Sequence, residues 1–309
     1  MSATTSAALD VLCLGFAVID HLALVPRLPG PDEIYAAQAV DVQGGGPAAT
    51  AAVTLARLGA RAAYVGTLGD DSGGEFALAE FRRFGVDVSG VVQVAGARSV
   101  NSVILVQPPY RSILYDLGDV PELQPAQIDP AQIRAARILH LDGHYQAAAM
   151  RAARLAREAG VLVSLDGGAG ELWLGLEELL WLVDILVVAR WFAQQYTGED
   201  EVEKAGSKLL AYGARIVGIT DGLRGSWVWT ADDHFHQPAY VVDVVDTTGA
   251  GDVYHGAFLY ALLQGWPLRR VAAFASATAA LKCCRLGGRA GIPTSDQVEE
   301  FLQAQNVSA

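Results

Sequence analysis

Cysteine is scarce in this chain of 309 residues, and its pattern excludes a disulfide framework. Cys13 lies in an apolar run that predicts a buried strand, and only Cys283 and Cys284 remain. Those two are adjacent, and neighbouring side chains on a helix point apart, so they do not indicate a zinc site. Reduced thiols are typical of the cytoplasm, which is the location that we expect.

Lysine is rarer than in most proteins of this size, with Lys204, Lys208 and Lys282 as the only examples. The pattern Gly-x-x-x-x-Gly-Lys-Ser/Thr does not occur, which excludes a P-loop enzyme. The formal net charge of −12 disfavours a nucleic acid or an anionic membrane as partner. A small-molecule partner is compatible with this charge, because its contacts are local.

Long uncharged hydrophobic runs are also missing. The most apolar segment, residues 179–192, is interrupted by Asp184 and Arg190, so no membrane-spanning helix is expected. The first ten residues, MSATTSAALD, lack a basic region followed by an apolar one, and we expect no signal peptide. The chain is nevertheless long enough to bury a sizeable core.

Short apolar runs alternate with helical patterns along most of the chain, which predicts an α/β fold with a largely parallel sheet. No linker or repeat divides the chain, so we expect a single domain over residues 1–309. The expected strands are residues 11–16, 62–65, 138–141, 161–165, 185–188 and 216–220. The expected helices are residues 46–58, 76–84, 147–158 and 202–212.

The segment with the clearest chemistry is residues 246–252, DTTGAGD, directly before the apolar run 253–263. It predicts a tight glycine turn at the start of a helix. Its bare N–H groups and the positive end of the helix dipole would together bind one anion. Asp252 would lie at the mouth of that site, as phosphoryl transfer to a hydroxyl requires. A carboxylate that merely complements the helix dipole is the plainer alternative.

Four more glycine motifs occur in order: Gly15 followed by Asp20, then GGGPAAT at 44–50, GTLGDDSGG at 66–74 and TDGLRG at 220–225. With the turn at 246–252, they resemble the ribokinase or PfkB family of carbohydrate kinases. The amino-acid sequences of residues 44–59 and 279–293 are most similar to those of the sulfofructose kinase branch. This resemblance implies a three-layer α/β/α sandwich with a mostly parallel sheet and a small β lid, formed by about residues 21–42 and 97–118.

The resemblance also implies roles for individual residues, with ATP and Mg²⁺ as cofactors. It makes Asp252 the base and places the anion hole at Gly249, Ala250 and Gly251. The implied substrate-binding residues are Asp20, Gly45, Gly46, Thr50, Asp116 and His144. The implied nucleotide-binding residues are Thr220, Gly222, Gly225, Ala275 and Ala279. Asp246 and Thr248 would bind a monovalent cation such as K⁺, or else simply cap the turn.

Plain structural roles compete with some of these assignments. Ala275 and Ala279 could serve helix packing alone, and His144 could be a partly buried structural histidine. Thr50 stands where most relatives have asparagine, so one substrate contact differs. Many relatives also carry an Asn-x-x-Glu motif for Mg²⁺ and phosphate, but residues 189–192 read ARWF. Arg190 could reach a phosphate or could be a solvated helix residue.

The type of acceptor is predicted from the absence of basic residues in the first part of the lid and the helix that follows it. A sulfonate requires Arg, Lys or several N–H donors, yet residues 28–55 contain neither Arg nor Lys. Positions that are basic or amide in the sulfofructose kinase branch correspond here to Ile34, Asp116 and His144. We therefore expect a small neutral sugar acceptor, a ketose or pentose, phosphorylated on a primary hydroxyl.

Three alternatives remain open from the sequence. One is a nucleoside kinase, in which lid tyrosines such as Tyr35, Tyr110 and Tyr115 stack on a base. The others are a sulfofructose kinase and a non-catalytic sensor of sugars or nucleotides. The intact turn at 246–252 argues against the sensor. The resemblance also implies a homodimer that forms through the lid.

Overall fold

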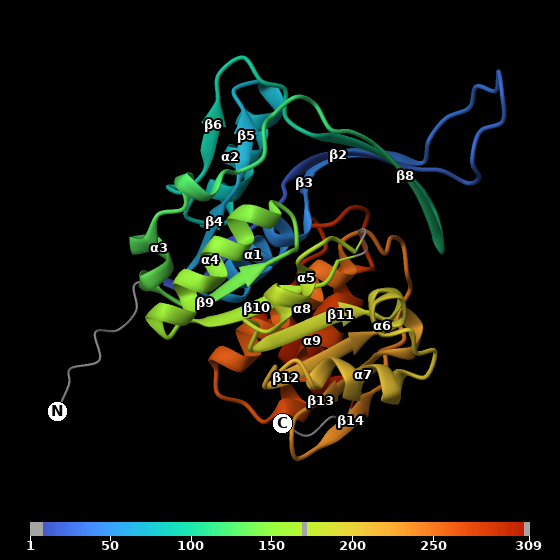
Figure 1. The fold of residues 1–309 in the computed structure, drawn as a ribbon. Coiled ribbons are helices and arrows are strands. Elements are labelled where there is room, and N and C mark those ends of the chain that lie inside the picture. The colour runs from blue at the N-terminus through green and yellow to red at the C-terminus, as the bar shows by residue number, and fades with distance from the viewer. Residues whose placement is uncertain (1–8, 169–171, 306–309) are drawn as a thin grey trace.

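The computed structural model describes residues 9–168 and 172–305, and its largest element is an eight-stranded sheet (Figure 1). Neighbouring strands follow the order β14-β13-β12-β11-β10-β9-β1-β4. The strands from β12 to β4 are parallel, and β13 and β14 are antiparallel at one edge. The strands are β1 (Leu9–Leu14), β4 (Ala62–Val65), β9 (Ala136–Leu141), β10 (Leu162–Asp166), β11 (Ile185–Ala189), β12 (Ile216–Thr220), β13 (Ser226–Trp229) and β14 (His234–Gln237).

Helices cover both faces of this sheet, because alternate side chains of each strand point to opposite faces. Val11 and Cys13 of β1 enter one core, and Leu12 and Leu14 enter the other. The first core is covered by α1 (Pro47–Leu58), α2 (Ser72–Arg83), α8 (Ala250–Leu263), α9 (Leu268–Lys282) and α10 (Ser295–Ala304). The second is covered by α3 (Pro130–Ala135), α4 (Gln146–Ala159), α5 (Leu176–Leu180), α6 (Arg190–Thr197) and α7 (Val202–Leu210). The predicted layered α/β fold is thereby confirmed.

A second sheet of four strands, which we call the lid, stands away from the layered body in Figure 1. Its order is β3-β2-β7-β8, and the pairing is antiparallel except between β2 and β7. Its strands are β2 (Val18–Leu24), β3 (Ala39–Gly45), β7 (Asn101–Gln107) and β8 (Tyr110–Asp116). On its inner face Leu22, Ile104 and Val106 pack against Leu286 of the body. A smaller pair, β5 (Thr67–Gly69) and β6 (Val92–Val94), lies beside α2.

Most expected elements agree with the structure to within a few residues. The strands expected at 62–65 and 216–220 coincide with β4 and β12. The helix expected from residue 76 begins earlier, because the Asp71 side chain caps it by accepting the N–H of Gly74 at 2.9 Å. The lid segment expected at about residues 21–42 contains β2 and β3 in part, but its middle, residues 25–38, forms no strand.

The described helices include none that is both long and apolar enough to cross a bilayer. Cys13, Cys283 and Cys284 are all free thiols, and Cys13 is buried in the core as expected.

Candidate active site

The turn at residues 246–252 leads directly into α8, whose first residue is Ala250. Gly249 precedes the helix with φ 72° and ψ 6°, a left-handed conformation that favours glycine. A Cβ on Gly251 would meet no heavy atom within 4 Å, so the first turn of α8 faces open space. The N–H of Ala250 donates to the carbonyl of Thr247 at 3.2 Å, whereas the other N–H groups of this first turn have no carbonyl partner inside the helix and can bind an anion.

Asp252 is half-buried in the same helical turn. Burial raises the pKa of Asp252 to about 7, and the negative charges of Asp166, Asp142 and Asp20 act in the same direction, whereas His255 opposes them. Carboxylates from several elements therefore act electrostatically on the predicted base. A general base is most effective when its pKa lies near the working pH, so this environment suits proton abstraction from a hydroxyl.

His255 is a buried partner that the sequence analysis missed. Its Nε2 lies 3.0 Å from the carbonyl oxygen of Val187, and its Nδ1 lies 2.8 Å from that of Gly251. Carbonyl oxygens only accept, so both contacts are hydrogen bonds only when both ring nitrogens carry a proton. Nδ1 also lies 3.3 Å from Oδ2 of Asp166, so the ring of His255 lies beside a buried carboxylate. In the sequence, the position of His255 three residues after Asp252 could have indicated that it lies on the same helix face as the candidate base.

Asp20 and the glycines of β3, which are predicted to bind the acceptor, lie together in the structure. The Asp20 side chain is buried, and its Oδ1 accepts a hydrogen bond from Ser102 Oγ at 2.6 Å. Burial raises the pKa of Asp20, and the bond from Ser102 opposes this shift. A Cβ on Gly45 would lie 2.2 Å from Asp20 Oδ2, so glycine is required beside this carboxylate. Gly46, with φ 94°, directly precedes the first residue of α1.

Asp142 is a second residue that the sequence analysis missed. Its buried carboxylate accepts the N–H groups of Phe16 at 2.8 Å, Ala48 at 3.1 Å and His144 at 3.0 Å. It thereby joins the end of β1 to the starts of α1 and α4. The signal for it was a carboxylate directly after the apolar strand β9.

His144 stacks on Phe16 with ring centroids 4.8 Å apart, and its Nδ1 lies 3.3 Å from Asp142. Burial alone would lower the pKa of His144, but the Asp142 carboxylate outweighs it, and the pKa is raised. A cavity of about 240 Å³ adjoins this histidine and is also lined by Asp166 and Trp173. Neither Asp20 nor Asp252 lines this cavity, and the acceptor contact of His144 stays a prediction.

Thr50 does not take the role predicted for it. Its side chain is buried, and its Oγ1 accepts a contact from Nε of Arg289 at 3.4 Å. Arg289 is itself buried, lies 2.5 Å from Glu80 and donates to the carbonyl of Gly45 at 3.0 Å. Glu80 also accepts the N–H of Gly44 at 2.9 Å. Thr50 thus belongs to a polar network beneath the glycine strand, because a larger cation fills the space next to it.

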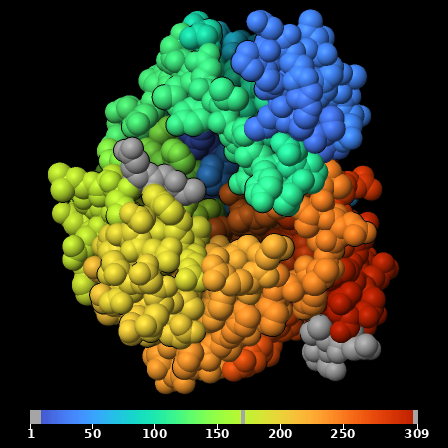
Figure 2. Space-filling view, turned by 90° about the vertical axis from the view of Figure 1, so that its right-hand side faces the viewer, coloured from blue at the N-terminus to red at the C-terminus, as the bar shows by residue number. Residues whose placement is uncertain are grey.

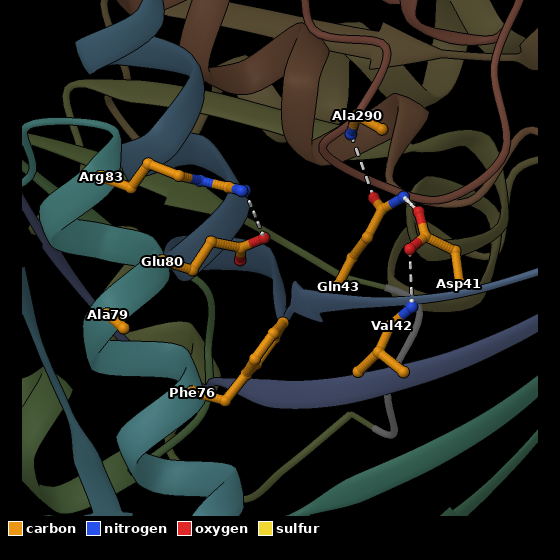
Figure 3. Close-up of a pocket in the computed structure, with 8 residues that line it drawn as sticks. All are labelled: Asp41, Val42, Gln43, Phe76, Ala79, Glu80, Arg83 and Ala290. Atoms are coloured by element: carbon orange, nitrogen blue, oxygen red, sulfur yellow. Dashed lines mark hydrogen bonds and ion pairs between the residues drawn. The ribbon is translucent and has the colours of Figure 1, made fainter.

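The C-terminal loop joins this network through Gln43 of β3, as Figure 3 shows. The side-chain oxygen of Gln43 accepts the N–H groups of Arg289 at 2.9 Å and Ala290 at 3.0 Å. A cavity of about 330 Å³ lies beside it, between β3 and α2, with Phe76 and Arg83 on the helix side. The loop before α10 therefore holds β3 in place.

The predicted nucleotide-binding residues are brought together only in part. Gly222 and Gly225 bound the short 3₁₀ helix η2 (Gly222–Arg224) after β12, and Thr220 ends that strand. Gly225 has φ 90°, and a Cβ there would lie 2.1 Å from the carbonyl of Gln237. Ala279 is half-buried near the end of α9, whereas Ala275 is fully buried in the core. Ala275 therefore serves helix packing and has no surface to offer adenine.

Arg190 occupies the segment where relatives carry Asn-x-x-Glu. Its Nη1 lies 2.9 Å from Asp221 and its Nη2 donates to the carbonyl of Asp200 at 3.1 Å. Neither alternative from the sequence describes this arrangement. Arg190 instead ties the start of α6 to the loop that carries the nucleotide-side glycines.

The lid reaches the anion-binding turn through Arg111 of β8, whose Nη1 donates to Thr247 Oγ1 at 2.6 Å. Figure 2 shows the resulting hollow, with the green tip of the lid touching the orange body beside it. Arg111 was not singled out from the sequence, although it is the one cation within β8. It brings a positive charge next to the predicted anion site.

Asp116 is not part of this site. It pairs with Asn101, whereas Tyr115 pairs with Ser102, the partner of Asp20. Alternate residues of a strand face opposite sides, so Asp116 lies on the outer face of the lid. Its side chain is 66% exposed and lies 3.4 Å from Arg98. The acceptor contact predicted for Asp116 would require the inner face of the lid, and the neighbouring residue Tyr115 is the one that faces inward.

Asp246 and Thr248 have protein partners. Oδ1 of Asp246 accepts the N–H and the hydroxyl of Thr248, both at 2.8 Å, and Oδ2 accepts the N–H of Gly287 at 2.8 Å. The backbone carbonyls of both residues accept hydrogen bonds from Nζ of Lys282. The turn-capping alternative therefore describes the Asp246 side chain, and these carbonyls do not fit the predicted K⁺ ion.

The sequence signature of the pfkB family carbohydrate kinases matches residues 8–295. The chain belongs to this family. The kinase is 34% identical over 296 residues to the ATP-dependent ribose-1-phosphate kinase of Halopiger xanaduensis, covering 94% of this chain and 97% of that protein. It is 31% identical over 323 residues to fructokinase-1 of Oryza sativa subsp. japonica, covering 95% and 98%. It is thus a carbohydrate kinase that phosphorylates an alcohol group.

Solved structures place this kinase in the ribokinase-like fold. A ribokinase-like structure from Agrobacterium tumefaciens superimposes with a TM-score of 0.89 at 30% identity, covering 98% of this chain and 100% of that one. The ribokinase of Arabidopsis thaliana, complexed with ribose and ATP, gives 0.83 at 27% identity and covers 96% and 99%. A ribokinase-like protein of E. coli, in complex with ATP and Mg²⁺, gives 0.84 at 22% identity and covers 96% and 99%.

Proposed function

We propose that this kinase transfers the γ-phosphoryl group of ATP to a primary hydroxyl of a neutral ketose or pentose. The observation that supports this acceptor is the charge of the crevice. Besides burial, the negative charges of Asp166, Asp142 and Asp20 all raise the pKa of the base Asp252, so the surroundings of the base are acidic. Carboxylates accept hydrogen bonds from hydroxyl groups and repel a sulfonate or a phosphate.

In the proposed reaction, Asp20 accepts hydrogen bonds from the sugar and holds it over Gly45. Asp252 accepts the proton of the attacking hydroxyl. The N–H groups of the turn at 249–251 stabilise the charge on the transferred phosphoryl oxygens. Because the transition state is loose, positioning and charge stabilisation contribute more than basicity.

The nucleotide would lie on the side of the turn where η2 is found. Leu223 and Val241 are 91% and 96% exposed on the loops of that side and offer apolar surface to a base. Among the described residues there is no cluster of three or more His, Cys, Asp and Glu side chains that could hold a metal. Mg²⁺ would therefore be bound mainly by the ATP phosphates and water, where it would neutralise phosphate charge.

A sugar phosphate is the second candidate acceptor. The relative from Halopiger xanaduensis is described as a ribose-1-phosphate kinase, and Arg111 brings a cation to the inner face of the lid. A neutral sugar remains the better supported acceptor, because Arg111 is bound to the anion-binding turn itself.

An acceptor screen tests the proposal. ADP release would be measured with ATP and fructose, ribose, sulfofructose, ribose-1-phosphate or adenosine. We expect the highest kcat/KM for a neutral ketose or pentose. Asp20→Asn should lower that value by about 10- to 100-fold, the effect of losing a hydrogen bond to a charged group. The matched control is Asp119→Asn, an exposed carboxylate beside the lid, which should change little.

Each alternative has its own outcome in this screen. A preference for sulfofructose or ribose-1-phosphate would overturn the neutral acceptor. Rapid turnover of adenosine would identify a nucleoside kinase, for which inward-facing Tyr115 is the available stacking partner. Tight sugar binding without turnover of any acceptor would identify a sensor. The resemblance to the sulfofructose kinase branch stays a prediction until this comparison is made.

We also propose that two copies associate through the outer face of the lid. Val103 and Leu114 are cross-strand neighbours there, and Val42 lies on the same face on the other side of His21; the three apolar side chains are 49%, 61% and 42% exposed. Sedimentation velocity should show a dimer, and Val103→Glu should give monomers. Leu174→Glu, at an exposed apolar position outside the lid, is the matched control and should leave the dimer intact. A wild-type monomer at micromolar concentration would contradict the proposal.

A further inference from the structure

The side chain of Lys282 ends beneath the anion-binding turn. Lys282 is the last residue of α9 and its side chain is fully buried, unlike those of Lys204 and Lys208, which are 60% and 53% exposed. Its Nζ donates to the backbone carbonyl of Asp246 at 2.9 Å and to that of Thr248. These are the two residues that the sequence motif assigns to a monovalent cation.

We propose that the ammonium group of Lys282 replaces the monovalent cation of this turn, so that the kinase works without potassium. The inference rests on phosphoryl transfer at the 246–252 turn. Lys282 would be a positioning residue, because it touches neither the acceptor nor ATP. It would act by fixing the peptide groups from which the anion hole is built.

The geometry of the peptide bond explains how a cation beneath the turn affects the side above it. In a planar trans peptide the C=O and N–H groups point in opposite directions. Lys282 holds the carbonyls of Asp246 and Thr248 toward itself, so the N–H groups of Thr247 and Gly249 point to the other side. Without Lys282, the two buried carbonyls would lack a hydrogen-bond donor, which is costly. The peptide groups of the turn would then no longer be held in this orientation.

The surroundings of Lys282 form a built site. The Asp246 carboxylate accepts three hydrogen bonds, two from Thr248 and one from Gly287. These bonds hold the turn in place next to Lys282. A Cβ on Gly291 would lie 2.3 Å from the carbonyl of Lys282, so the C-terminal loop covers this lysine closely. Burial lowers the pKa of Lys282, whereas the nearby charges of Cys283 and Asp246 oppose this shift.

The first test uses the wild-type kinase with its best acceptor from the screen. Rates would be compared in buffers that contain only K⁺, only Na⁺ or only tetramethylammonium, at equal ionic strength. We expect kcat to change by less than about twofold, whereas the coupling between an effector and a bound ligand typically changes affinity by about 5- to 150-fold. Activation by K⁺ on that larger scale would overturn the inference. Absence of turnover in every buffer would instead refute the proposed function.

The second test removes the ammonium group with Lys282→Met. We expect kcat in tetramethylammonium to fall by at least about tenfold, toward the ~10²–10³-fold loss for a missing anion-hole donor. Addition of K⁺ or NH₄⁺ should restore part of this rate. Lys204→Met, at an exposed lysine, is the control and should show neither effect. If Lys282→Met does not fold, Lys282→Gln retains one donor group for the same comparison.

Two results with folded variants would contradict this role. The first is an unchanged kcat in the absence of K⁺. The second is a loss that no monovalent cation reverses, which would make Lys282 a structural residue only.

Discussion

Replacement of Asp252 by asparagine should lower kcat by about 10²- to 10⁴-fold, the usual contribution of a positioned general base. The change keeps the size of the side chain and removes its ability to accept a proton. The dissociation constant for ATP should stay close to that of the wild type, because the N–H groups of the turn are unchanged. Steady-state kinetics and calorimetric titration would measure the two effects separately.

Asp232→Asn provides the matched control for this substitution, since Asp232 is an exposed carboxylate on the turn between β13 and β14. It should retain full activity. Equal turnover by Asp252→Asn and the wild type would refute the assignment of the base.

The same residue predicts how activity and stability depend on pH. Because burial raises the pKa of Asp252 to about 7 from its ordinary 3.8, kcat/KM should fall below neutral pH as the base becomes protonated. The folded protein holds this proton between these two pKa values, whereas the unfolded chain releases it. Asp252 therefore lowers stability as pH rises from about 4 to 7. Thermal denaturation at pH 8 should show a higher Tm for Asp252→Asn than for the wild type, and the difference should vanish near pH 4.

Replacement of Arg289 by methionine should destabilise the fold by about 3–5 kcal/mol, because it leaves the buried Glu80 without its charged partner. The carbonyl of Gly45 would also lose a donor. For a chain of this size a loss of that magnitude corresponds to a fall in Tm of roughly 10 °C. Urea denaturation and calorimetry would measure both quantities.

Glu80 itself supplies the control. Its second partner, Arg83, is 69% exposed and lies 3.3 Å away, so Arg83→Met should change stability by less than about 1 kcal/mol. The double variant Glu80→Met with Arg289→Met removes both buried charges and should recover much of the lost stability. A double variant as unstable as Arg289→Met alone would show that the unpaired charge is not the cause.

The sequence alone was sufficient for the layered fold and for the turn at 246–252, because both depend on local signals. Apolar runs of strand length predicted β4 and β12 to the residue. Glycines with a following carboxylate predicted a turn whose Gly249 adopts the left-handed conformation that only glycine adopts readily.

Side-chain partners that are distant in the chain could not be predicted in this way. Arg289 meets Glu80 across 209 residues, and Lys282 meets Thr248 across 34. The face on which Asp116 lies depends on strand register, where a shift of one residue reverses every side chain. The family resemblance assigned Ala275 to the nucleotide, with helix packing as the alternative, and its burial in the core agrees with the packing role. These features follow from tertiary contacts.

Product analysis by mass spectrometry tests the central claim most directly. The wild-type kinase would be incubated with ATP, Mg²⁺ and the neutral ketoses and pentoses of the screen. The account predicts that one neutral sugar is converted to its monophosphate in step with ADP formation, and that Asp252→Asn forms almost none. Phosphorylation of only a sulfonated or already phosphorylated sugar, or ADP release without any sugar phosphate, would contradict it.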